Sequence, residues 1–228
     1  MNLQLPDNVR QLSADEEFNF SCHPQVDCFT DCCRELELAL MPYDVLRLSR
    51  ILDITTAELL EQYCLIECEA DDIFPRVYLG MVDDGRASCP FVSKKGCAVY
   101  EGRPGACRTY PLGRAASRNI SGRCQAFHVL LTEPHCHGFA EPVEQTIARW
   151  TENQGLEPYN QFNDMLMTIT QHISIQNDMR LTREQQQLYV DTLYDLDGFC
   201  ARNRARQDDS DDELMTNGIK WLRNELFG

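Results

Sequence analysis

The stretch from Cys89 to Pro111 reads CPFVSKKGCAVYEGRPGACRTYP, and it decides how the surrounding chain can fold. Three glycines and three prolines interrupt it, so it cannot continue as one long helix or strand. Its cysteines, Cys89, Cys97 and Cys107, therefore lie in a segment that backbone hydrogen bonds alone would hold poorly. Thiolates that converge on a metal ion would hold it, and Gly96 permits a tight turn before Cys97.

A second group of cysteines lies upstream, at Cys22, Cys28, Cys32 and Cys33. Such short spacing brings thiolates together on a loop or first helical turn, as a tetrahedral metal site requires. Cys32 and Cys33 are adjacent, and because neighbouring side chains diverge, the pair rarely chelates one ion. The pair suits two ions, or an ion and a cluster, so the sequence indicates more than one metal or a polynuclear site.

The remaining cysteines fall into two classes. Cys124 and Cys136 follow the two groups, and Cys136 stands between His135 and His137. Imidazole is also a good zinc or iron ligand, so whether these histidines bind metal or are structural stays open. The others lack further ligands nearby and fit small buried hydrophobic residues better: Cys64, Cys68 and Cys200.

Charge and compartment limit the classes of function. The 228 residues carry a net charge of −15, which argues against a nucleic-acid partner. The start of the chain shows no basic segment followed by an apolar one, and no run is apolar enough to span a bilayer. We therefore expect a cytoplasmic protein without a membrane partner. In a reducing cytosol, the twelve cysteines are expected to be metal ligands and not disulfides. Disulfides remain an alternative only if the protein resides in an oxidising compartment.

Periodicity outside the cysteine groups predicts short regular elements. Apolar residues at helical spacing predict helices over 42–52 and 56–67, and alternation predicts strands over 76–82, returning as a hairpin through Ala87, and over 126–131. Helical patterns dominate the last part, at 143–153, 158–175, 182–206 and 212–227. Thr182 and Gln185 form a capping-box pattern.

These patterns predict a mainly α fold with a small, metal-stapled, cysteine-rich α+β part that contains one or two short β-hairpins. A C-terminal helical bundle completes it. Because eleven of the twelve cysteines lie at or before Cys136, we expect a cysteine-cluster metal-binding domain over 1–140. Residues 141–228 would then form a helical region that packs on it.

The cysteine groups resemble the YkgJ-type cysteine-cluster family of zinc- or iron-chelating domains. The CxxCxxCC-like run of that family corresponds to the first group, with wider gaps, and its C-P-F, G-C-x-V-Y and R-P-x-x-C-R-x-Y-P series matches the stretch quoted above. The resemblance covers about residues 22–136 and implies zinc, iron or an iron–sulfur cluster. The ligands it implies are Cys22, Cys28, Cys32, Cys33, Cys89, Cys97 and Cys107, with Cys124 or Cys136 in an eighth position.

Two arginines flank Cys107. Four thiolates around one divalent cation leave a charge of about −2, which fixed cations nearby would offset. Arg103 and Arg108 supply guanidinium donors that stay charged, so we expect them to support the metal-bound sulfurs.

The function indicated is metal binding with a structural or redox-sensing role. One alternative is an iron–sulfur enzyme such as a protein-lysine methylase, because the chain also resembles flagellin lysine methylases more distantly. The chain has no nucleotide-binding glycine loop and no H-E-x-x-H helix, so whether it is an enzyme stays open. Another alternative is an interaction adaptor, in which the acidic C-terminal helices bind a protein partner and metal only stabilises the fold.

Overall fold

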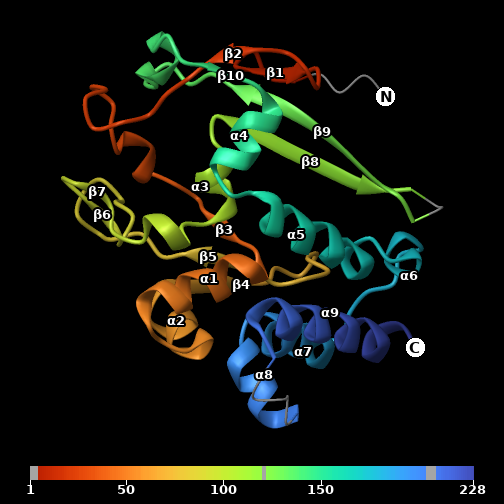
Figure 1. The fold of residues 1–228 in the computed structure, drawn as a ribbon. Coiled ribbons are helices and arrows are strands. Elements are labelled where there is room, and N and C mark those ends of the chain that lie inside the picture. The colour runs from red at the N-terminus through yellow and green to blue at the C-terminus, as the bar shows by residue number, and fades with distance from the viewer. Residues whose placement is uncertain (1–4, 120–121, 204–208) are drawn as a thin grey trace. The chain divides into compact units, whose positions relative to one another are not determined.

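The computed structural model describes residues 5–119, 122–203 and 209–228. Within these ranges the chain has a mixed α+β fold of short strands and helices (Figure 1). It divides into two compact units that alternate along the sequence. The cysteine unit comprises the described residues up to Leu36, Met81–Tyr100 and Gly105–Pro158, and the helical unit comprises Glu37–Gly80, Glu101–Pro104 and the described part of Tyr159–Gly228.

The cysteine unit is built on an antiparallel sheet with the strand order β1-β9-β8. Its strands are β1 (Val9–Leu12), β8 (Leu112–Arg118) and β9 (Cys124–Leu131). The strand predicted over 126–131 is therefore confirmed, and it begins two residues earlier. Two smaller antiparallel pairs are β2 (Phe18–Asn19) with β10 (Glu144–Gln145), and β6 (Val92–Ser93) with β7 (Gly96–Cys97). The helical segments are η1 (Asp31–Cys33), α3 (Gly105–Thr109), η3 (His137–Ala140) and α4 (Ile147–Asn153).

The core of the cysteine unit is centred on Phe20. Its ring makes edge-to-face contacts with Tyr110, Phe139 and Trp150, at centroid distances of 6.0, 5.1 and 5.4 Å. The buried cluster around it consists of Leu12, Phe18, Phe20, Leu112, Leu130, Trp150 and Leu156. Since Phe20 lies two residues before Cys22, this packing fixes the point from which the first cysteine segment departs.

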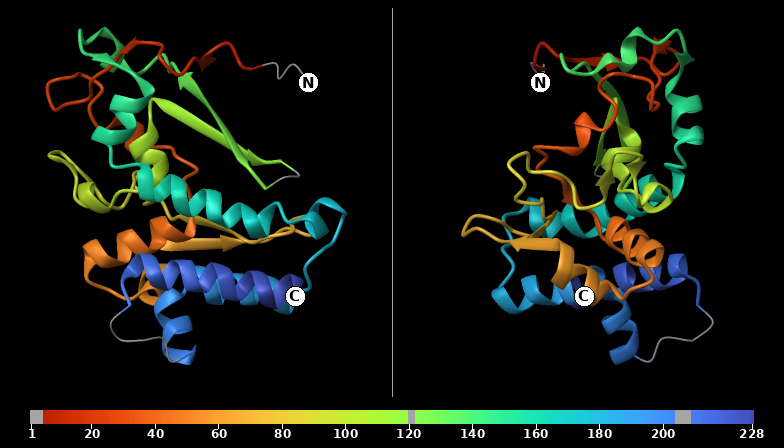
Figure 2. Two further views of the ribbon diagram at one scale, coloured as in Figure 1. Left: turned by 45° about the vertical axis from the view of Figure 1, so that its right-hand side comes forward. Right: turned by 90° about the vertical axis from the view of Figure 1, so that its left-hand side faces the viewer.

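The helical unit contains a second antiparallel sheet, ordered β3-β5-β4. These strands are β3 (Ala39–Leu40), β5 (Arg76–Leu79) and β4 (Cys64–Glu67). Its helices are α1 (Pro42–Leu52), α2 (Thr56–Tyr63), α6 (Ile173–Gln176), α7 (Arg183–Leu193), α8 (Leu196–Asn203) and α9 (Asp211–Phe227), together with α5 (Glu157–Thr170), whose first two residues belong to the cysteine unit. The short 3-10 helix η2 (Tyr100–Gly102) begins in the cysteine unit and ends in the helical unit. Helix α9 runs beside α7 (Figure 2).

Several predicted boundaries were wrong, each for a local reason. The helix predicted over 56–67 ends at Tyr63, because the next four residues pair with β5, with Cys64 opposite Leu79. Cys64 and Cys68 therefore do not share a helix face. The helix predicted over 182–206 is interrupted after Leu193, where the Asp195 carboxylate accepts a hydrogen bond from the Gly198 N–H at 3.1 Å, and its last part, 204–206, lies outside the described residues.

Two further helices are shorter than predicted. The one predicted over 143–153 begins only at Ile147, since Glu144 and Gln145 pair with β2. The one predicted over 158–175 breaks after Thr170, and the His172 ring caps the short helix α6. The predicted capping box of Thr182 and Gln185 is confirmed. The division into domains at residues 140 and 141 stays a prediction, and within the described ranges no helix is both long and apolar enough to cross a membrane.

An arginine ties α1 to α8 and α9 within the helical unit. Arg50 donates to both oxygens of Asp197 at 2.7 and 3.0 Å, and its Nε donates to Asp211 at 2.9 Å. Burial acts to raise the pKa of the Asp197 carboxyl, but hydrogen bonds from Arg50 and Thr56 prevail, and the pKa is lowered.

We expect Arg50→Met to lower the free energy of unfolding by roughly 1–2 kcal/mol at neutral pH, because a partly buried bidentate pair is lost. A carboxyl whose pKa is lower in the folded state stabilises the protein above its unfolded pKa and loses that contribution as the pH falls. The difference between variant and wild type should therefore shrink below the ordinary pKa of 3.8. Urea unfolding at several pH values measures it, and a difference that stays constant down to pH 3 would contradict this account.

Candidate metal centre

The adjacent cysteines Cys32 and Cys33 lie in the short turn η1. The Cys33 carbonyl accepts a hydrogen bond from the Cys89 N–H at 2.8 Å, and the Glu35 N–H donates to Ala87 at 3.0 Å. These bonds place the C-P-F element beside the adjacent pair, although more than fifty residues separate them in the sequence. The two cysteine groups of the sequence are therefore brought together by backbone pairing.

A tight turn returns the chain from Cys89 to Cys97. Strands β6 and β7 pair there, and the Ala98 N–H donates to the Phe91 carbonyl at 2.8 Å. Gly96 has a φ of 111°, and a Cβ atom at this position would lie 3.1 Å from the ring of Phe29. The prediction of a glycine-dependent turn before Cys97 is confirmed. Helix α3 follows and carries Cys107.

A third segment brings Cys136 to the loop that holds Cys22 and Cys28. The Ser21 N–H donates to the Gly138 carbonyl at 3.1 Å, and the His137 N–H donates to the Cys28 sulfur at 3.1 Å. A Cβ atom on Gly138 would lie 2.7 Å from the Phe20 ring and 2.8 Å from the Ser21 carbonyl oxygen, so only glycine fits this approach.

Electrostatic interactions among the thiols show which cysteines are neighbours. Burial, followed by the nearby thiols of Cys32, Cys28 and Cys136, raises the pKa of Cys22 to about 11. Burial also raises the pKa of Cys136, which interacts with Cys28. Cys22, Cys28, Cys32 and Cys136 therefore form one neighbourhood.

The other neighbourhood includes Cys33. The pKa of Cys33 is raised, first by its hydrogen bond to the Cys32 sulfur, then by burial and by the nearby thiols of Cys32, Cys89 and Cys107. Burial raises the pKa of Cys89, whose thiol also interacts with Cys97 and Cys32. Cys33, Cys89, Cys97 and Cys107 are thus grouped, and the two neighbourhoods meet at residues 32 and 33.

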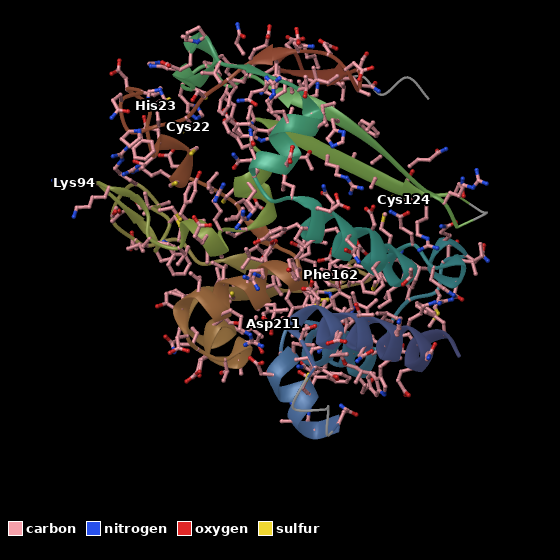
Figure 3. All side chains as sticks on the ribbon, viewed as in Figure 1. Cys22, His23, Lys94, Cys124, Phe162 and Asp211 are labelled. Atoms are coloured by element: carbon pink, nitrogen blue, oxygen red, sulfur yellow. The ribbon has the colours of Figure 1, made fainter. Side chains whose placement is uncertain are left out.

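Cys124 is not brought to either neighbourhood. It begins strand β9 opposite Arg118, its side chain is exposed, and Figure 3 shows it near the free end of the β8–β9 hairpin, away from Cys22. Each of the twelve cysteines is a thiol, and none takes part in a disulfide in the part of the chain that the structure describes. His135 is exposed and lies 3.5 Å from the Glu133 carboxylate.

The two flanking arginines are both buried. The Arg108 guanidinium donates to the Gln154 carbonyl at 2.7 Å. Arg103 belongs to the helical unit, where its carbonyl accepts a hydrogen bond from the Tyr159 hydroxyl at 3.3 Å. Their expected support of metal-bound sulfurs stays a prediction.

The thiols are neighbours without forming a closed site. Among the described residues, no three cysteine, histidine or acidic side chains stand at the mutual positions that a bound metal ion requires. Metal binding would thus need the thiols to turn toward one another.

Comparison with known families adds an independent observation. Residues 21–137 match the model of the CxxCxxCC family, which is described as a "putative zinc- or iron-chelating domain". The chain belongs to this family. The matched region begins just before Cys22 and ends just after Cys136, so it contains both neighbourhoods. No curated protein and no solved structure gave a significant match.

Three features of this region were missed by the sequence reasoning. The sequence showed no signal for the Gly138 contact with Phe20 or for the His137 N–H bond to Cys28. Tyr110 stands within the R-P-x-x-C-R-x-Y-P element, but the sequence pattern alone indicates no role for it.

Proposed function

We propose that this CxxCxxCC-family protein binds zinc or iron at two sites of four cysteines each. The first site comprises Cys22, Cys28, Cys32 and Cys136. The second site comprises Cys33, Cys89, Cys97 and Cys107. The meeting of two thiol neighbourhoods at the adjacent residues 32 and 33 carries this proposal.

The chemistry of the donors fits such ions. Sites made only of cysteine suit tetrahedral zinc and iron–sulfur clusters alike, because both prefer thiolate sulfur. The adjacent pair contributes one thiolate to each site, which avoids chelation of one ion by two diverging neighbours. Closing each site needs rotation of cysteine side chains, which have a single rotatable bond to sulfur.

The proposed role of the metal is structural. The cysteine-bearing loops contain only two-residue strands and short helical turns, so few backbone ladders hold them. Ligands from three segments of the chain would be crosslinked by the ions, and the binding free energy would then contribute to folding. The exposed side chain of Cys32 favours redox sensing as a second role, since accessible thiolates oxidise and release metal.

Metal analysis of anaerobically purified wild-type protein tests the proposal. We expect two zinc ions per chain without visible absorbance, or iron with acid-labile sulfide and broad visible absorbance. The second result would keep the ligand assignment and favour the redox role. Protein that binds neither metal, even after reconstitution, would overturn it.

Single variants test the division into two sites. We expect Cys22→Ser and Cys97→Ser each to lose about half of the bound metal, because each removes one ligand from a different four-coordinate site. Cys136→Ser should also lose about half. Cys124→Ser and Cys200→Ser serve as matched controls and should retain the wild-type content. Full metal content in both Cys22→Ser and Cys97→Ser would contradict the assignment.

A further inference from the structure

The hydroxyl of Tyr110 is buried without a hydrogen-bond partner in the part of the chain that the structure describes. A buried polar group without a partner is costly, so such a group is uncommon and points to something that satisfies it. Tyr110 directly follows helix α3, and its backbone N–H donates to Ala106 at 3.2 Å. The unsatisfied oxygen is therefore held in place by ordered backbone.

The surroundings of the hydroxyl are fixed as well. The Tyr110 ring packs edge-on against Phe20, and the preceding residue, Thr109, accepts a hydrogen bond from the Trp150 indole at 3.1 Å. Tyr110 and Cys136 both pack against the same buried core. Burial, then the nearby Cys136 sulfur and Glu133 carboxylate, raise the pKa of the hydroxyl, but neither group lies in hydrogen-bond geometry with it.

We propose that Tyr110 donates a hydrogen bond to the Cys136 sulfur when the first site holds its metal ion, and so acts as a positioning residue for that ligand. This inference rests on the proposed function. A metal-bound sulfur is a thiolate and thus accepts hydrogen bonds, whereas a neutral thiol is a poor acceptor. Loading the site would give the buried Tyr110 hydroxyl an acceptor.

The Cys136 sulfur fits this role better than the carboxylate. Glu133 already lies 3.5 Å from the His135 ring, and its side chain is more than one-third exposed, so water can satisfy it. Cys136, like Tyr110, is partly buried and packs against the core around Phe20. Hydrogen bonds to ligand sulfurs orient them and adjust their electron donation to the metal.

Cobalt(II) binding to the full chain gives a direct test, because charge transfer from thiolate to cobalt reports on the sulfur. We expect Tyr110→Phe to weaken cobalt and zinc binding to the first site by about ten- to hundredfold. The charge-transfer band should also move to longer wavelength, because a sulfur without its hydrogen bond releases electrons more easily. Competition with a chelator measures the affinity.

Matched variants separate this role from a structural one. Tyr194→Phe removes a buried hydroxyl that donates to the Leu40 carbonyl at 3.1 Å in the helical unit, and it should change neither the affinity nor the band. In a Glu133→Gln background, Tyr110→Phe should have its full effect. Loss of the effect in that background would mean that the hydroxyl serves the carboxylate, which would overturn the inference.

The remaining outcomes are also decisive. If Tyr110→Phe weakens binding but leaves the band unmoved, the residue acts only through packing and the inference fails. If affinity and band both match those of wild type, it fails as well, while the two metal sites stand. Wild-type protein that binds no cobalt or zinc would instead remove the proposed function itself.

Discussion

The double variant Cys32→Ser/Cys33→Ser should purify with almost no bound zinc or iron. It removes one ligand from each proposed site, and a tetrahedral site that retains three thiolates binds its ion far more weakly. Because the metal would contribute to folding, we also expect the cysteine unit of this variant to be degraded rapidly by a protease. Elemental analysis and limited proteolysis measure the two effects.

The matched control for this variant is Cys64→Ser/Cys68→Ser. It also replaces two cysteines, although these stand four residues apart, and they lie on and after strand β4 of the helical unit. The control should bind as much metal as wild type. Equal metal content in the two double variants would show that the adjacent pair does not bind metal.

The second large effect is expected from Phe20→Ala. The Phe20 side chain is 2% exposed and contacts three other aromatic rings, so its truncation leaves a cavity in the core of the cysteine unit. Such a substitution lowers the free energy of unfolding by about 3–5 kcal/mol. Metal affinity should fall too, because the chain between Phe20 and Cys22 pairs with Gly138 near Cys136. Urea unfolding of metal-loaded protein and chelator competition measure these changes.

Leu222→Ala is the corresponding control in the helical unit. Leu222 is fully buried in α9, and its truncation should destabilise the protein by about 2–5 kcal/mol. Its metal affinity should match that of wild type, because Leu222 belongs to the other unit. If Phe20→Ala left both the unfolding midpoint and the affinity unchanged, the described packing of the cysteine unit would be refuted.

The cysteine groups were the part of the candidate site that the sequence could predict. Glycine and proline breaks between Cys89 and Pro111 excluded long regular elements, and the structure contains only short ones there. The choice between Cys124 and Cys136 needed the fold. Both follow the second group, but only Cys136 lies beside Cys28, because the neighbouring His137 N–H donates a hydrogen bond to the Cys28 sulfur. Sequence spacing alone does not predict such a contact.

The errors in the fold came from tertiary pairing that overrides local preference. Residues 64–67 continue the helical pattern of α2, yet they form an edge strand because β5 lies beside them. Glu144 and Gln145 likewise carry no strong strand signal and are extended through pairing with β2. The helix capped by Thr182 begins where it was predicted, because capping residues act locally, although it ends earlier than predicted.

The position of Cys32 and Cys33 on one peptide bond has a consequence for metal uptake. In the proposed arrangement, an ion bound at either site fixes the backbone of η1 and so orders the ligand of the other site in advance. The second ion then binds with a smaller loss of chain entropy, which is positive cooperativity. Singly loaded molecules would be scarce, and under metal limitation the population would divide into filled and empty chains. Such a protein responds to metal scarcity as a switch with a threshold.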